Sequence, residues 1–357
     1  MTDFVFSADA HMNEPKTLWA DTLPASMRDA ALKTERVDGY IVMSGGGKVL
    51  HRMKLGDGTS GDERHGKYEI APRLADMDRD GVDAEILYPQ LGLMTCNLVE
   101  PDLERAHCEI YNDWIIRNVA GYRHKFVPVA LLPVLDLAMA EAELKRCVGL
   151  GFTTAMVPCG LPPGVPSYNS DAWDRVWAVA AEHDMPIVFH TGTGPDRVFE
   201  RGAGAAVLNY LAVSNICIDA IAKMVLGGAL DRFPKLKIVS VEAGASYLIS
   251  LAERMDESYT QHKFYVSPKL SMLPSEILRR QVRATFQYDK SCIVARERIG
   301  LECLMFATDY PHMEGTFPHT RTVITHLFDG VDIDASSRKA ILGETAAALF
   351  RLERKAA

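Results

Sequence analysis

Eight short apolar runs, each four to six residues long, constrain the fold of this chain more than any other feature. They are Phe4–Ala8, Ala84–Tyr88, Phe126–Leu131, Thr153–Val157, Pro186–His190, Lys237–Val241, Val282–Phe286 and Cys303–Phe306. Stretches that can form helices follow most of these runs, for example residues 103–119, 137–148 and 170–183. This alternation is typical of strand–helix units around a parallel sheet. Eight such units predict an α/β protein with a (β/α)8 TIM barrel.

The length of 357 residues suits one such domain, because α/β barrels with long loops run beyond about 250 residues. Residues from about 14 to 72 contain a Gly-Gly-Gly run (45–47) and the polar run GDGTSGDERHG (56–66). We expect this stretch to be an insertion after the first strand. Residues from about 265 to 280 carry Pro268 and Pro274 and are expected to form a cover segment or a subunit contact. The expected organisation is a single domain over residues 1–357 with loop insertions.

The net charge and the cysteine pattern limit which partners and which cellular compartment are expected for this protein. The net charge of −8 disfavours a nucleic-acid partner, because such proteins usually present a basic face. The N-terminus lacks the features of a signal peptide, and no run approaches the length of a membrane span, so we expect no membrane partner. The seven cysteines are scattered and form no C-x-x-C pair, which indicates neither a disulfide framework nor a zinc knuckle. These features predict a cytoplasmic protein.

Polar side chains at the ends of the apolar runs are the candidates for chemistry, because barrel enzymes react at the carboxyl ends of their strands. Asp9 and His11 follow the first run two residues apart, so both point to the same side of an extended chain. His190 ends the fifth run, Glu242 follows the sixth, and Asp309 lies shortly after the eighth. Carboxylates and imidazoles in this arrangement suit a divalent Zn, Mn or Fe ion.

Each of these residues also has an ordinary explanation when it is taken alone. A D-x-H pair is common by chance, His190 fits a core histidine, and Asp309 fits a turn before a proline. Their joint placement at four strand ends favours the metal site. His312 and His319, in the loop after the eighth strand, are possible substrate contacts, whereas His107 is expected to serve packing or to lie on the surface.

Five segments give the chain a family resemblance: SADAHMNEP (7–15), RLADMDRDGVDAEILYP (73–89), VFHTGTG (188–194), FPKLKIVSVEAG (233–244) and MFATDYPH (305–312). Together they resemble the amidohydrolase-related family typified by aminocarboxymuconate-semialdehyde decarboxylase. The resemblance implies a TIM barrel and metal ligands at Asp9, His11, His190 and Asp309. Members include non-oxidative decarboxylases, hydrolases and hydratases, and a few related proteins hold two irons, or iron with manganese, and activate O2. Family members are often oligomers, so a homo-oligomer is expected.

The chain departs from the decarboxylases at the end of its sixth strand. Those enzymes typically have a proton-transferring histidine there, whereas this sequence has Glu242. A glutamate could act as a general acid or base if burial raised its pKa, or it could be a further metal ligand. The full set of candidate ligands holds four carboxylates and two imidazoles, which would suit two ions: Asp9, His11, Glu14, His190, Glu242 and Asp309.

These observations lead to one principal hypothesis and two alternatives. The first is metal-dependent hydrolysis or non-oxidative decarboxylation of a small carboxylate-bearing organic acid, with Asp309 as base and Glu242 as proton shuttle. The second is an O2-dependent hydroxylase with a dinuclear Fe or Fe/Mn centre, motivated by Glu14 and Glu242. The third is a catalytically silent subunit of a hetero-oligomer. The number and identity of bound metals distinguish these hypotheses.

Overall fold

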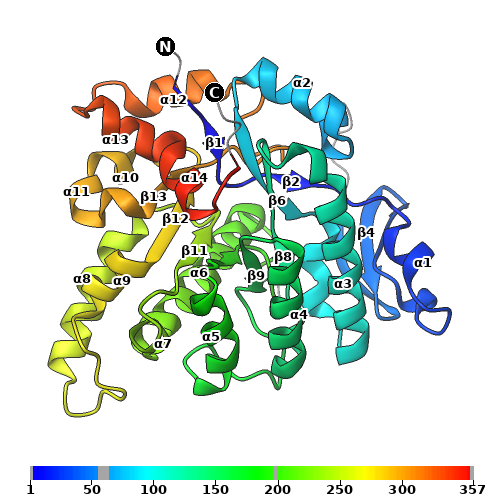
Figure 1. The fold of residues 1–357 in the computed structure, drawn as a ribbon, viewed down its shortest axis with the longest axis horizontal. Helices are drawn as coiled ribbons and strands as arrows, with labels where there is room; N and C mark the ends of the chain where they lie inside the picture. The colour runs from blue at the N-terminus through cyan, green and yellow to red at the C-terminus, as the bar shows by residue number, and fades with distance from the viewer. Residues whose placement is uncertain (1–2, 55–63, 196–198, 354–357) are drawn as a thin grey trace.

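A ring of short parallel strands surrounded by helices forms the body of the molecule (Figure 1). The computed structural model describes residues 3–54, 64–195 and 199–353, so most of the polar run at 56–66 lies outside the described residues. The barrel strands are β1 (Phe6–Ser7), β2 (His11–Met12), β6 (Ala84–Pro89), β7 (Phe126–Pro128), β8 (Ala130–Leu131), β9 (Ala155–Pro158), β10 (Ile187–His190), β11 (Ile238–Val241), β12 (Val282–Phe286) and β13 (Leu304–Phe306). Their pairs are all parallel.

Strand pairing closes this ring. One sheet runs in the order β13-β12-β11-β10-β9-β8, while β6 pairs with β1, β2 and β7. The amide of Ala8 donates to the carbonyl of Phe306 at 3.0 Å, and Ala10 forms a parallel bridge with Tyr310, which joins the last strand to the first. At the other junction, the amide of Val129 donates to the carbonyl of Leu87 at 3.1 Å. The predicted TIM barrel is confirmed.

Two predicted strands are interrupted in the structure. The first pairs as β1 and again, beyond its predicted end at Ala8, as β2, and the run from Phe126 to Leu131 is divided into β7 and β8 at Val129. The interruption follows a change of partner, because β7 pairs with β6 whereas β8 pairs with β9. Every residue of β6, β9, β10 and β11 is buried, as expected for parallel strands covered on both faces.

Helices pack around the strands, and the last of them follow the final strand β13. They are α2 (Ile70–Asp80), α3 (Pro101–Asn118), α4 (Leu137–Leu150), α5 (Asp174–Glu182), α6 (Ala205–Leu226), α7 (Ala229–Arg232), α8 (Tyr247–Gln261), α9 (Pro274–Gln281), α10 (Lys290–Val294), α11 (Arg296–Ile299), α12 (Thr320–Phe328), α13 (Ala335–Lys339) and α14 (Thr345–Leu349). Local sequence sets several boundaries. Asp136 caps α4 by accepting from the amides of Ala138 and Met139, and Gly81 ends α2 in the left-handed conformation.

A small antiparallel sheet follows β2. It consists of β3 (Lys33–Val37), β4 (Tyr40–Gly45) and β5 (Lys48–Lys54), with α1 (Leu18–Thr22) before it, and lies at the right of Figure 1. His107 on α3 fastens this stretch to the barrel: its Nε2 accepts from the amide of Leu32, and its carbonyl accepts from Trp19 Nε1, both at 3.0 Å. The packing role expected for His107 is thus observed.

Helix α6 is long and apolar enough to cross a membrane by length and composition alone, with a mean hydropathy of 1.6. It contacts β10, β11, α7 and α9, as an outer helix of the barrel does. Only 17% of its most apolar stretch is buried within the chain. Its outer face therefore presents apolar side chains to the surroundings, among them Val207, Leu208 and Leu211.

Candidate metal centre

Asp9 and His11 meet at the carboxyl end of the first strand. Both side chains are fully buried, and His11 Nε2 lies 3.6 Å from Asp9 Oδ1. His11 Nδ1 lies 2.7 Å from the carbonyl oxygen of Pro89. Because a carbonyl oxygen only accepts, Nδ1 carries the proton and Nε2 presents a lone pair towards Asp9.

His190, the last residue of β10, brings a second imidazole to the same point. Its Nε2 lies 3.2 Å from His11 Nε2 and 3.4 Å from Asp9 Oδ1. Its Nδ1 lies 2.9 Å from the carbonyl oxygen of Thr191, so this ring also holds its proton on Nδ1. When both rings are neutral, two nitrogen lone pairs face each other, an arrangement that a shared cation would stabilise.

These three side chains fit a divalent metal ion in chemistry and in spacing. Ligand atoms about 2.1 Å from a tetrahedral ion lie about 3.4 Å from one another. The distances that join Asp9 Oδ1, His11 Nε2 and His190 Nε2 are 3.2, 3.4 and 3.6 Å. Both carboxylate oxygens of Asp9 are buried without a hydrogen-bond partner among the described residues, a state that costs free energy and that a cation relieves.

Asp309 lies beside these three groups, after β13. Its Oδ1 is 3.5 Å from His11 Nε2 and 2.8 Å from His312 Nδ1. Its backbone φ is +54°, in the left-handed region that residues other than glycine rarely adopt. The amide of Asp309 donates to the carbonyl of Asp9 at 2.8 Å, so the pairing that closes the barrel also holds this strained residue in place.

Glu242 follows β11 and stands at the edge of the centre, also with a positive φ, +66°. Its Oε2 accepts from the Thr191 hydroxyl at 2.5 Å and lies 3.7 Å from His190 Nδ1. The Tyr210 hydroxyl lies 3.4 Å from its Oε1. Oxygen atoms of Glu242, Asp309 and the exposed Glu314 also come within 4.8 Å of one another. The structure thus brings Glu242 close to the ligand group, with hydroxyl partners on both of its oxygens.

Glu14, the remaining sequence candidate, is not brought into this group. Its carboxylate accepts three backbone hydrogen bonds, from the amides of Gln90, Leu91 and Gly92, at 2.9–3.1 Å. Glu14 lies beyond the end of β2, and even continued alternation from Asp9 and His11 would direct Asn13, and not Glu14, towards the centre. Its oxygens hold the loop after β6 instead.

Burial and mutual charge shift the pKa values of the clustered groups. Burial and the positive charges of His312 and His190 lower the pKa of His11 well below its usual value. Burial opposes a charge on His190, but the Asp9 carboxylate raises its pKa to about 9. Burial raises the pKa of Asp309 to about 8, against the effect of His312. The cluster therefore holds protons that a bound cation would replace.

Sequence reasoning missed two neighbours of the centre and did not place a third against Asp309. Tyr88 on β6 places its ring 5.9 Å from the His11 ring and 4.9 Å from the His190 ring, measured between centroids. Gln90 Oε1 lies 2.9 Å from His312 Nε2, opposite Asp309. His312 was singled out for its loop alone, but a turn sets it against Asp309, since its amide donates to the Asp309 carbonyl at 2.9 Å.

Comparison with known proteins identifies the family to which this chain belongs. A sequence model of the amidohydrolase family matches residues 8–352. The chain belongs to the amidohydrolase family, which confirms the family inferred from the five sequence segments.

Among curated relatives, the decarboxylase orsB of Emericella nidulans is 25% identical over 221 residues, which cover 57% of this chain and 64% of that protein. The gamma-resorcylate decarboxylase of a Polaromonas species is 26% identical over 263 residues, or 68% of this chain and 76% of that protein. The fold is similar to the crystal structure of a dihydroxybenzoic acid decarboxylase from Polaromonas with bound manganese and the inhibitor 2-nitroresorcinol. That match has a TM-score of 0.67 and 19% identity, and covers 99% of this chain and 98% of the other.

Proposed function

We propose that this protein is a metal-dependent carboxy-lyase that removes CO2 from a small aromatic acid without oxidation. The observation that carries the proposal is the buried group of Asp9, His11 and His190 at the carboxyl ends of the barrel strands. Its spacing suits one divalent ion. The curated relatives described above are named decarboxylases, and the named substrate of one of them is a hydroxylated benzoic acid. This supports the same class of substrate here.

We further propose that one ion is bound per chain and that manganese is the first candidate. Asp9, His11 and His190 would hold it, with Asp309 beside them. The second cluster of oxygens, which includes Glu242, is less suited to a structural ion, because Glu314 is exposed and Glu242 already has hydroxyl partners. The manganese in the Polaromonas structure supports the choice of metal.

Two side chains around the centre would have different roles in the proton transfers of decarboxylation. A bound divalent ion supplies Lewis-acid stabilisation of charge on substrate oxygens. When the bond between ring carbon and carboxyl group breaks, its electron pair remains on the carbon, which takes up a proton as CO2 leaves. Burial raises the pKa of Glu242, against the effect of His190, which favours the protonated carboxyl group that would deliver this proton. Asp309 would accept a proton from a substrate hydroxyl.

The test is turnover of gamma-resorcylate and related hydroxybenzoates by manganese-loaded protein, with and without O2. The proposal predicts one CO2 and one decarboxylated phenol per substrate consumed, at the same rate under nitrogen and in air. O2 consumption in step with turnover would identify the hydroxylase instead. Bound metal without turnover of any aromatic carboxylic acid would contradict the proposed reaction.

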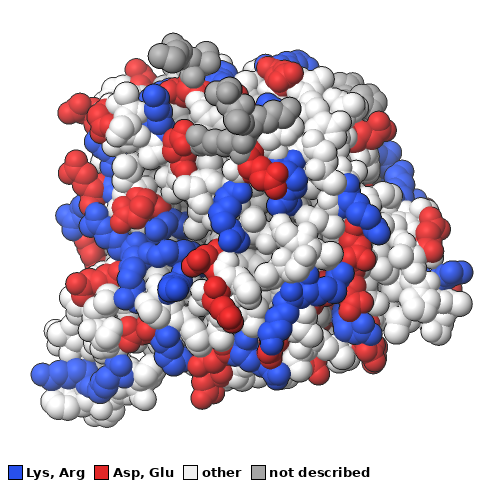
Figure 2. Space-filling view, in the orientation of Figure 1, with Lys and Arg blue, Asp and Glu red and all other residues white. Residues whose placement is uncertain are grey.

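We also propose that the chain forms a homo-oligomer in the cytoplasm. All seven cysteines lie in the described part of the chain, are buried and form no disulfide there, which suits a reducing compartment. The exposed apolar face of α6 supports self-association, since Val207 and Leu211 are 65% and 54% exposed. Basic and acidic groups are interspersed on the face seen in Figure 2, without an extended basic stripe. Light scattering after Leu211→Glu tests the oligomer, because a charge in a subunit contact should dissociate it.

A further inference from the structure

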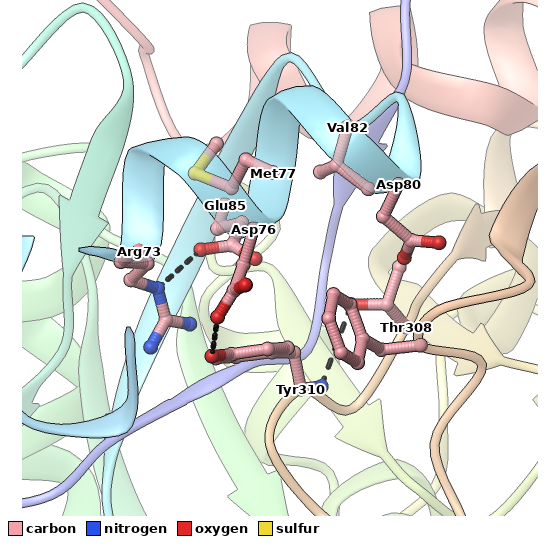
Figure 3. Close-up of a pocket in the computed structure, with 9 residues that line it drawn as sticks. Arg73, Asp76, Met77, Asp80, Val82, Glu85, Thr308 and Tyr310 are labelled. Atoms are coloured by element: carbon pink, nitrogen blue, oxygen red, sulfur yellow. Dashed lines mark hydrogen bonds and ion pairs between the residues drawn. The ribbon is translucent and has the colours of Figure 1, made fainter. Parts of the chain in front are cut away.

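Arg73 on α2 is a fully buried arginine near the metal centre, and none of the roles above involves it. Figure 3 shows its guanidinium beside Glu85, which lies on β6, and close to Tyr310. A buried charge costs much free energy unless it is paired and hydrogen-bonded. The hydrogen-bond and ion-pair partners of Arg73 therefore indicate its role in the structure.

The guanidinium joins α2 to the backbone of a candidate ligand. Its Nε donates to Glu85 Oε2 at 2.6 Å, and its Nη1 donates to the carbonyl of His11, also at 2.6 Å. Nη1 lies 3.4 Å from the carbonyl of Gly66 as well. Arg73 thus holds the main chain of His11, while Pro89 holds its imidazole.

Arg73 also contacts the segment that carries Asp309. Its guanidinium carbon lies 4.8 Å from the centre of the Tyr310 ring, within cation–π range. Tyr310 directly follows Asp309, and its carbonyl accepts from the amide of His11 at 2.6 Å. Its hydroxyl donates to Asp76 Oδ2 at 2.5 Å. One side chain therefore connects the two segments that present His11 and Asp309.

Stability alone does not explain this arginine. Nη2 of Arg73 is buried without a hydrogen-bond partner among the described residues. The side chain lines a small cavity, with room for about one water molecule, together with Asp76, Asp80, Glu85, Thr308 and Tyr310 (Figure 3). A buried ion pair is often no more stabilising than apolar side chains of similar size. Apolar residues, however, would leave the His11 carbonyl without its donor.

We infer that Arg73 is a positioning residue that sets the placement of His11 relative to Asp309 and thereby the affinity of the centre for its ion. The inference rests on the proposed function in one respect, that the centre binds a divalent ion. It does not depend on the substrate. Metal affinity is sensitive to such groups, because the partners that orient a ligand typically change it by about 10–100-fold.

The test compares the dissociation constant of Mn2+ and the melting temperature of the metal-free protein in three variants. Arg73→Met/Glu85→Leu replaces the ion pair with apolar side chains and leaves no unpaired charge. Arg73→Lys keeps the charge but not the planar fork of donors. Arg146→Met is the control, because it removes ion pairs with Glu143 on α4 and Asp113 on α3, neither of which is among the groups described at the centre.

We expect Mn2+ to bind about 10–100-fold more weakly to the double variant and about tenfold more weakly to Arg73→Lys. Arg146→Met should lower the melting temperature and leave Mn2+ binding unchanged. A folded Arg73 variant whose affinity for Mn2+ stays within about twofold of the wild type would overturn the inference. If the double variant does not fold, the affinity of Arg73→Lys alone tests it. Wild-type protein that binds no Mn2+ would instead contradict the proposed function.

Discussion

The Nε2 atoms of His11 and His190 lie 3.2 Å apart, although 179 positions separate the two residues in the chain. In its neutral form each ring keeps its proton on Nδ1, bound to a backbone carbonyl, so that two lone pairs would converge beside Asp9 when His190 has lost its second proton. The carbonyls of Pro89, the last residue of β6, and of Thr191, directly after β10, fix this orientation. The barrel therefore brings together the groups of the proposed cation site through contacts of the protein itself.

Asp309→Asn should separate metal binding from catalysis. The change removes charge and basicity while keeping the shape of the side chain. We expect most of the metal to remain, because Asp9, His11 and His190 are unchanged, and turnover to fall by about a hundredfold or more through loss of the base. Metal content and initial rates measured on the same preparation check this. Equal losses of both would make Asp309 chiefly a ligand.

Glu242→Gln tests the proposed proton donor at the position where the decarboxylases that the chain resembles typically have a histidine. Its oxygens have the Thr191 and Tyr210 hydroxyls as partners, so the amide should be accommodated. We expect unchanged metal stoichiometry and turnover reduced on the order of a hundredfold. Elemental analysis with rate measurements decides the matter, since the loss of one metal equivalent per chain would show that Glu242 ligates a second ion.

Glu14→Gln should affect stability and not metal content. One of its oxygens would become an NH2 group facing the backbone N–H groups of the loop after β6, so at least one hydrogen bond is lost. We expect the free energy of unfolding to fall by about 1–3 kcal/mol. Denaturant titration of the metal-free protein measures this. If Glu14→Gln and Glu242→Gln each lost one metal equivalent per chain, the result would support a dinuclear centre and the O2-dependent hydroxylase.

Glu104 on α3 should make stability depend on pH. Burial raises its pKa to about 7, although the amide of Leu135 donates to its carboxylate at 2.8 Å. An unfolded glutamate titrates near about 4.3, so the folded state binds the proton more tightly and stability falls as pH rises between about 4 and 7. Glu104→Gln should remove this loss, with a gain of up to roughly 3 kcal/mol at pH 8.

Unfolding of the metal-free wild type and Glu104→Gln at pH 5 and pH 8 measures that difference. The advantage of the variant should be small at pH 5 and large at pH 8. An advantage that is the same at both values would mean that Glu104 does not titrate in this range.

The sequence predicted the barrel and the ligand group for the same physical reason. Regular alternation along buried strands determines which side chains point inward, and parallel strands have their carboxyl ends at the same side of the barrel. The proximity of Asp9, His11 and His190 could therefore be predicted from the sequence. Glu14 lies past the end of β2, where the path of the loop decides the direction of a side chain. No alternation applies there.

Contacts between loops were beyond prediction for the same reason. His312 meets Asp309 through a turn, and the spacing of three residues between them is a usable signal only once that turn is known. Gln90 approaches His312 from the loop after β6, which no periodicity describes. Arg73 lies within residues 73–89, which contribute to the family resemblance, but its bond to the His11 carbonyl depends on how α2 packs.

The metal content of protein purified without added metal tests the central claim most directly. Wild-type protein, His11→Ala and His190→Ala should be analysed together by elemental analysis, with circular dichroism to verify folding. The account predicts about one divalent ion per wild-type chain and little metal in either folded variant, because each change removes one of three ligands. Full metal occupancy in both variants would contradict the proposed centre.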